Sequence, residues 1–203
     1  MEAKMKKLLV VALGALALAS TAQAEWYVQG NLGYSKIKTS GLEDGGKISD
    51  KTFTPSVAVG YKMADWRVAV DYTDYGKAKD SYHYVEEYGY ESGKVDLKAR
   101  GVGVAAIYDI DLNSAITPYV GARLALNKIK ITDHITEKKR DSIENTVERD
   151  TSTKLGYGVL LGASYDLMPN LAADAAVEYN ILGKEDGVTV KQYGVKAGLR
   201  YTF

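Results

Sequence analysis

Side chains that commonly carry catalysis are scarce in this chain of 203 residues. It has two histidines, His83 and His134, and no cysteine. Nucleophilic catalysis needs a base within hydrogen-bond reach of the nucleophile, whereas Ser81 and His83 are only neighbours in sequence. The carboxylates are numerous enough that counting alone leaves an acidic protease open. Because no Ser–His pair falls on the apolar face of an expected strand, we predict that the chain is not an enzyme.

Motifs for cofactors and metals are missing from the sequence as well. It contains no glycine-rich phosphate loop, no zinc-ligand spacing and no calcium-binding loop. The acidic run at residues 43–46 offers too few ligands to specify a metal, and without cysteine neither thiolate ligands nor disulfides can form. We therefore expect no cofactor.

Charged residues occur instead at alternate positions within apolar segments. Arg67 and Asp71 are an even number of residues apart, as are Asp174 and Glu178, so each pair shares one face of a strand. Because unpaired charges in an enclosed interior are costly, we predict an inward-facing network of compensating charges: Arg67, Asp71, Arg123, Asp174, Glu178, Lys196 and Arg200. The alternative is a narrow path for ions or water along the same residues.

The elements that would position these charges are strands with one apolar and one polar face. In the last stretch the apolar face carries Tyr193, Val195, Ala197, Leu199, Tyr201 and Phe203. An outer-membrane barrel turns such a face to lipid and its polar face to the lumen. Eight segments alternate in this way, near residues 26–38, 52–62, 66–77, 97–109, 117–130, 152–165, 171–183 and 188–203. The sequence predicts an all-β fold, an eight-stranded antiparallel transmembrane β-barrel of the outer-membrane type.

Eight strands enclose an interior just wide enough for side chains to fill. Glycines recur on the expected inward face, at positions 101, 103, 156, 158 and 162. We predict that they make room for the arginine side chains; the alternative is that a glycine lining leaves a gap.

The connections between the expected strands alternate in length. Those at residues 62–65, 109–116 and 166–170 are short, whereas those at 39–51, 78–96 and 131–151 are long and polar. Outer-membrane barrels have short periplasmic turns and longer external loops. We therefore expect three long external loops, and both termini on the periplasmic side.

The beginning of the chain has the features of an export signal. Three lysines precede an apolar run, and Ala22-Gln23-Ala24 fits a small-x-small cleavage site. We predict a signal peptide over residues 1–24, cleavage between Ala24 and Glu25, and a barrel domain over 25–203. Removing residues 1–24 takes three lysines and one glutamate from 26 basic and 26 acidic residues, so the mature chain is slightly negative. Nucleic acid, which selects clustered positive charge, is not an expected partner.

Two of the long connections contain residues suited to binding. Tyr82, Tyr84, Tyr88 and Tyr90 lie among serine, glycine and acids, a composition typical of antibody contact loops. The other interpretation is that these tyrosines extend the neighbouring strands and pair across a hairpin. The second connection carries the basic patch Lys138, Lys139 and Arg140, which is either a contact site or solvated surface.

Several segments resemble one family of outer-membrane proteins. PYVGARLALN (118–127), GYGVLLGASYDLMPNL (156–171) and YGVKAGLRYTF (193–203) are similar to the membrane strands and turns of the opacity (Opa) family, including its smaller-looped relative, neisserial surface protein A. The resemblance implies an eight-stranded barrel in the outer membrane of a Gram-negative bacterium, labelled porin in family catalogues. It also implies external loops that attach to host receptors or surface polysaccharide, although those loops do not match here.

The expected partners follow from this location. Outer-membrane lipid would contact the apolar face, and anionic lipopolysaccharide could meet Lys98 and Arg100 or the basic patch. The C-terminal strand, with Tyr201 and Phe203, resembles the signal that the barrel assembly machinery recognises. Host-cell receptors or matrix are the expected external ligands, and a structural or pore-forming barrel is the alternative function.

Overall fold

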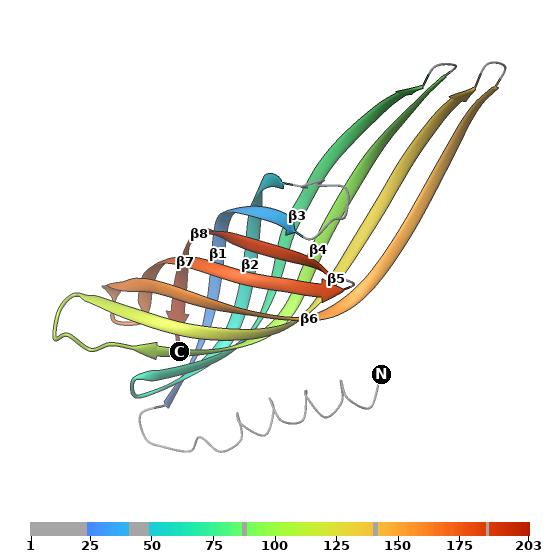
Figure 1. Ribbon diagram of the computed structural model, residues 1–203. Coiled ribbons are helices and arrows are strands. Elements are labelled where there is room, and N and C mark those ends of the chain that lie inside the picture. Colours follow the sequence, from blue (N-terminus) through green and yellow to red (C-terminus); the bar gives the residue numbers. More distant parts are fainter. Residues whose placement is uncertain (1–23, 41–48, 87–88, 140–141, 186) are drawn as a thin grey trace, which may run out of the picture.

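The computed structural model describes residues 24–40, 49–86, 89–139, 142–185 and 187–203. Eight antiparallel strands form one closed barrel in sequence order, and β8 pairs with β1 (Figure 1). The strands are β1 (Ala24–Ser40), β2 (Ser49–Met63), β3 (Trp66–Glu86), β4 (Gly89–Asp109), β5 (Ile116–Lys139), β6 (Ser142–Met168), β7 (Leu171–Glu185) and β8 (Val188–Thr202). The predicted fold class is therefore confirmed. Among the described residues, no helix is long and apolar enough to span a membrane.

The two faces of the barrel wall differ as the alternation predicts. Leu32 on the outer face is 71% exposed, whereas Arg67 on the inner face is 1% exposed. A soluble protein would bury its large apolar side chains, but here Val57, Leu124 and Leu161 all face outward and are more than half exposed. The barrel thus has an apolar exterior and a largely polar interior.

Aromatic side chains border this apolar exterior at both ends. At the end with the short turns, Trp26 packs on Tyr61 with ring centroids 5.2 Å apart, and Trp66 lies 5.0 Å from Tyr108. At the opposite end Tyr34 packs on Phe53 at 5.6 Å. Two aromatic girdles around an apolar band are typical of transmembrane barrels.

Four strands extend well beyond the rest of the barrel (Figure 1). The strand ends predicted at residues 77, 97, 130 and 152 are wrong, because β3 to β6 continue through most of 78–96 and 131–151. Neighbouring strands remain paired along this whole extension, from Lys77–Lys98 to Glu86–Gly89 and from Lys130–Thr151 to Lys139–Ser142. Backbone pairing, which needs no apolar side chains, explains why a polar sequence forms strand here. The remaining expected loop, 39–51, is shorter than predicted at both ends, because β1 continues to Ser40 and β2 begins at Ser49. Residues 41–48 lie outside the described part.

We call this extension the hairpin sheet, and define it as residues 77–86, 89–98, 130–139 and 142–151. β4 and β5 pair through it, from Lys98–Lys130 to Tyr90–Lys138, so its four strands form one continuous sheet. The described pairing of β2 with β3 stops at Ser56–Thr73, and that of β6 with β7 stops at Tyr157–Ile181. The hairpin sheet therefore has one edge on β3 and one on β6.

A bulge in β3 marks the point where the hairpin sheet leaves the barrel. The register shifts between Asp74 and Lys77, and Gly76 has a φ of 76°. The Asp74 carboxylate accepts a hydrogen bond of 2.9 Å from the Gly76 backbone N–H. A Cβ on Gly76 would also collide with Thr52. Glycine is thus required here by both backbone conformation and space.

Substituting this glycine tests the bulge. Gly76→Ala is expected to lower the free energy of unfolding by about 1–2 kcal/mol, because an L residue is strained at positive φ. The matched control is Gly30→Ala on the outer face, where an added Cβ meets nothing within 4 Å. Urea unfolding of both variants in detergent micelles measures the difference, and equal stability of the two would contradict a strained bulge.

Candidate functional site

The lumen contains a first cluster of charges near the short-turn end. Arg67 donates hydrogen bonds from Nε and Nη2 to Asp109 Oδ1, at 3.0 and 2.7 Å. Its Nη1 also lies 3.7 Å from Asp174 Oδ1, and Arg200 Nε donates to Asp174 Oδ2 at 3.3 Å. All four side chains are 7% exposed or less. Two arginines and two carboxylates thus compensate one another inside the barrel.

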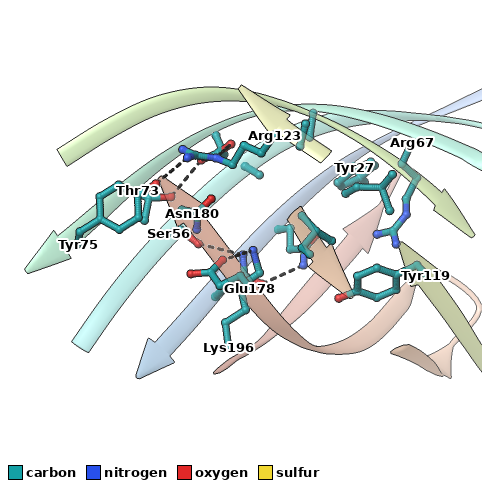
Figure 2. A pocket seen from close by; sticks show the side chains of 18 residues that line it. Tyr27, Ser56, Arg67, Thr73, Tyr75, Tyr119, Arg123, Glu178, Asn180 and Lys196 are labelled. Atoms are coloured by element: carbon teal, nitrogen blue, oxygen red, sulfur yellow. Dashed lines mark hydrogen bonds and ion pairs between the residues drawn. The ribbon is translucent and has the colours of Figure 1, made fainter. Parts of the chain in front are cut away.

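Aromatic rings flank this cluster. The Tyr119 ring lies 4.7 Å from Arg67 Cζ, and the Tyr27 ring lies 5.8 Å from Arg200 Cζ (Figure 2). Both distances are within the range of cation–π attraction. Gly60 and Gly162 leave the space that these rings occupy, because a Cβ at either would overlap Tyr27 or Tyr119.

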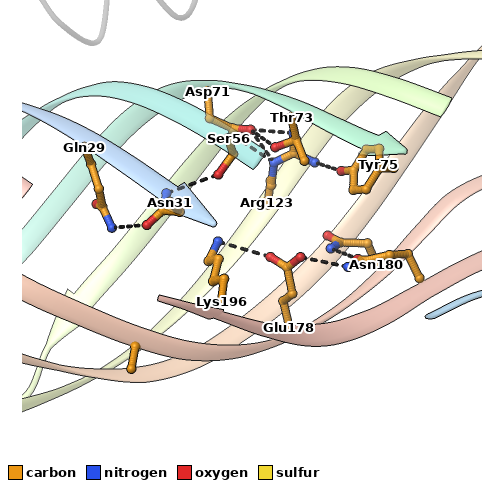
Figure 3. A network of polar contacts seen from close by, with 12 residues as sticks. Gln29, Asn31, Ser56, Asp71, Thr73, Tyr75, Arg123, Glu178, Asn180 and Lys196 are labelled. Carbon is orange, nitrogen blue, oxygen red and sulfur yellow. Dashed lines mark hydrogen bonds and ion pairs between the residues drawn. The ribbon is translucent and has the colours of Figure 1, made fainter. Parts of the chain in front are cut away.

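A second group of charges lies farther along the lumen, toward the hairpin sheet. Arg123 donates from Nε and Nη2 to Asp71, with distances between 2.6 and 3.0 Å, and from Nη1 to the Tyr75 hydroxyl at 2.6 Å (Figure 3). Thr73 donates to the same carboxylate at 3.0 Å. Such a bidentate pair of a guanidinium and a carboxylate fixes the orientation of both Arg123 and Asp71.

Glu178 is the centre of the remaining polar contacts. Its carboxylate lies 3.1 Å from Lys196 Nζ and accepts a hydrogen bond of 2.8 Å from Gln192. Gln192 in turn accepts one of 2.6 Å from Asn180 (Figure 3). Each of these carboxylates thus has a basic partner, so none of them is positioned as a free general base.

The lumen beyond these charges is closed by apolar side chains. Ile37, Leu97 and Leu182 are at most 1% exposed and pack in one cluster with Tyr75, Ala78, Ala99, Ile129 and Val190. The cavity between the charge groups has a volume of about 50 Å³, which is room for a few waters. The interior is filled rather than open.

All seven charged residues singled out in the sequence lie in this interior and take part in ion pairs with one another or with Asp109. Asp109 was not predicted from the sequence, because this residue is the last of its strand. Its position nevertheless continues the alternation of the inward residues Ala105 and Ile107. The lumen tyrosines were also missed, since tyrosine is common on both faces. Within the described ranges, no group of three His, Cys, Asp or Glu could hold a metal.

The prediction for the inward glycines holds at one position only. A Cβ on Gly103 would approach the Arg123 guanidinium to 2.7 Å. Gly101 and Gly156 instead make room for Asn127, Gly158 for Asn180, and Gly162 for Tyr119. Amide and phenol side chains fill the lumen together with the arginines.

The candidate contact residues lie near the tip of the hairpin sheet. Tyr82 and Tyr84 are strand residues of β3, Tyr90 belongs to β4, and Lys138 and Lys139 end β5; Tyr88 and Arg140 lie outside the described residues. The register places Tyr84 opposite Glu91, Tyr82 opposite Gly93, and Tyr90 opposite Lys138. Tyr82, Tyr84 and Tyr90 thus extend the strands, and the register places none of these three opposite another. The two candidate sets, far apart in sequence, share one sheet.

Acidic residues also lie opposite each other in the hairpin sheet. Asp133 of β5 pairs in register with Glu148 of β6. Burial raises the pKa of Asp133, and the Glu148 carboxylate raises it further. This part of the sheet therefore carries negative charge that disfavours an approaching polyanion.

The first strand and the C-terminus meet at the short-turn end of the barrel. Ala24 is the first residue of β1, and Glu25 follows it within the strand. Phe203 donates a backbone hydrogen bond of 2.9 Å to Trp26, and its ring lies 5.2 Å from that of Tyr201. The terminal aromatic residues thus complete the closure between β8 and β1.

The chain is similar to known proteins along nearly its whole length. The family model described as "Opacity family porin protein" matches residues 59–203. An uncharacterized protein of Haemophilus influenzae is 38% identical over 200 residues, covering 98% of this chain and 100% of the relative. Protein opa of the same organism is 39% identical over 145 residues, covering 71% of this chain and 100% of that protein. The crystal structure of neisserial surface protein A matches with a TM-score of 0.59 and 34% identity, over 89% of this chain and 99% of that one.

Proposed function

This chain belongs to the Opacity family of outer-membrane β-barrels, and we propose that it is a surface adhesin whose hairpin sheet contacts host or matrix ligands. The observation that carries the proposal is the length of β3 to β6. These strands have 21, 21, 24 and 27 residues, against 15 to 17 for the other four. About 9–11 residues suffice to cross the hydrocarbon, so the extra length projects outside.

Membership of this family identifies the membrane in which the barrel lies. Its members are non-enzymatic barrels of the Gram-negative outer membrane, in agreement with the location and the absence of catalysis predicted from sequence. The short turns then face the periplasm, and the hairpin sheet faces the outside.

The construction of the hairpin sheet supports a binding role. A continuous four-stranded sheet is already ordered before it meets a ligand, which reduces the entropy lost on binding. Its edges on β3 and β6 present backbone groups that an extended peptide can pair with. Tyrosines near its tip, at 82, 84 and 90, are residues that contribute contact area at low entropic cost.

The filled lumen supports adhesion over the alternative of a pore. Conduction needs a continuous aqueous path, whereas here two groups of ion pairs and the apolar cluster around Ile37, Leu97 and Leu182 lie in series. The cavity between these groups, of about 50 Å³, has room for only a few waters.

Shortening the hairpin sheet tests the proposal. Lys79, Asp96, Thr132 and Arg149 lie opposite one another on a single rung across the four strands. Replacing residues 80–95 and 133–148 with Asn-Gly turns removes the sheet beyond that rung and keeps the register. We expect at least tenfold less adherence to epithelial cells and matrix proteins by a non-adherent bacterium that displays the shortened barrel at matched surface levels.

Two further variants localise the contacts and guard against misfolding. Shortening only one hairpin reports which half binds, and Tyr82→Ser/Tyr84→Ser/Tyr90→Ser keeps the backbone while it removes the aromatic area. Undiminished adherence of the fully shortened barrel would exclude the hairpin sheet as the binding surface. Absence of adherence by the intact protein, together with ion conductance in planar bilayers, would favour the pore instead.

A further inference from the structure

Basic residues face outward directly beyond the apolar band, on the side of the hairpin sheet. On β5, Lys128 and Lys130 are exposed and alternate with Asn127 and Ile129, which are 1% and 5% exposed and face the lumen. The outward positions that precede them, Leu124 and Leu126, belong to the apolar band. The basic side chains thus begin where the apolar exterior ends.

Strand register brings these residues into direct opposition. Lys77 lies opposite Lys98, and Lys98 lies opposite Lys130, so three strands contribute one row. One step nearer the membrane, Arg100 lies opposite Lys128. We call Lys77, Lys98, Arg100, Lys128 and Lys130 the basic belt. Side chains at directly opposed positions have Cβ atoms about 4.5–5.5 Å apart, and like charges there are destabilising.

The same arrangement recurs on the other side of the barrel. Lys36 of β1 lies opposite Lys51 of β2, and Lys38 of β1 lies opposite Lys191 of β8. Lys36 follows Tyr34, an aromatic residue of the girdle, at the next outward position. Opposed basic pairs are therefore a repeated feature of this level of the barrel.

Protein carboxylates compensate little of this charge. Among the described residues, the ion pair made by the basic belt joins Arg100 Nε to Asp74 Oδ2 at 3.0 Å, and Arg100 remains 48% exposed. Four lysines of the belt are thus left for an anion from outside the protein. Two opposed lysines can reach a single phosphate, which converts a repulsive pair into a bridged one.

The position of the belt selects the kind of anion. A soluble polyanion that arrives along the hairpin sheet passes Asp133 and Glu148, which lie opposite each other between its tip and the belt. A lipid of the outer leaflet instead places its phosphates at the edge of the apolar band and its acyl chains against Leu124 and Leu126. We propose that the basic belt is a binding site for the phosphates of a phosphorylated glycolipid, the lipid A part of lipopolysaccharide. The proposal is independent of adhesion by the hairpin sheet.

Binding of labelled lipid A to the folded barrel in uncharged detergent tests this inference. We expect bisphosphorylated lipid A to bind at least tenfold more tightly than the same lipid without phosphates, and 1 M salt to reduce the difference. The belt variant, Lys98→Gln/Lys128→Gln/Lys130→Gln, should lose this preference for the phosphorylated lipid. The control variant, Lys62→Gln/Lys94→Gln/Arg149→Gln, also loses three positive charges, but outside the belt, and should retain the preference.

The free energy of unfolding gives a second test, because the belt substitutions should affect it differently with and without lipid A. Without an anion, the belt variant should be at least as stable as the wild type, because it loses opposed like charges. In micelles that contain bisphosphorylated lipid A, the wild type should gain stability and the belt variant should not. Equal affinity for the lipid with and without phosphates, or loss of the preference in the control variant, would overturn the proposal. Competition by millimolar inorganic phosphate would overturn the assignment to a lipid.

Discussion

Asp174→Ala is expected to lower the free energy of unfolding by about 3–5 kcal/mol, because it leaves the buried Arg200 without its carboxylate. Asp174 is the acceptor for Arg200 Nε and lies 3.7 Å from Arg67 Nη1. After the substitution, Arg200 would keep the ring of Tyr27, and Arg67 would keep Asp109 and the ring of Tyr119. Urea titration of the barrel in detergent micelles, followed by tryptophan fluorescence, measures the change.

A paired substitution distinguishes lost charge compensation from lost packing. Asp174→Leu/Arg200→Met removes the carboxylate and its hydrogen-bonded arginine together, so it should recover more than half of the lost stability. Arg100→Ala is the control, since it breaks the exposed pair with Asp74 and should cost less than about 1 kcal/mol. If the double variant were as unstable as Asp174→Ala, an unpaired buried charge would not be the cause.

Leu161→Arg is expected to cost about 2–4 kcal/mol in a lipid bilayer, although Leu161 is 58% exposed. In a soluble protein, replacing an exposed leucine with arginine would change stability little. Leu161 lies on the outer face of β6, midway between the aromatic residues Tyr157 and Tyr165, so an arginine there would meet the hydrocarbon centre. Unfolding measured in phospholipid vesicles gives the cost.

The same strand and face provide the control for this experiment. Thr153 is exposed on β6 beyond Tyr157, and Thr153→Arg should cost no more than about 1 kcal/mol because it lies outside the apolar band. Similar costs at the two positions would contradict the assigned depth of the band. In water-soluble detergent at high concentration, the difference between the variants should shrink as the micelle adapts.

The predictions that succeeded rest on local alternation. Arg67, Asp71 and Arg123 could be assigned to the lumen because every second residue of a strand shares a face. Asp109 follows the same rule, but it lies where the strand was expected to end. The extension of β5 and β6 escaped prediction, and that of β3 and β4 was only one of two interpretations of the tyrosines. Residues 78–96 and 131–151 are mostly polar, so hydrophobicity alone does not mark them as strand.

The amino-acid sequence by itself determined the strand number, the apolar and polar faces, and the identity of the paired lumen charges other than Asp109. These properties follow from the order of neighbouring residues. Only the tertiary structure decided that Arg67 meets Asp109 and Asp174, that Tyr90 lies opposite Lys138, and that Lys77, Lys98 and Lys130 form one row. These contacts between strands depend on the register of each strand pair and on the closure of the barrel. Register and closure are properties of the assembled sheet, and no single strand contains them.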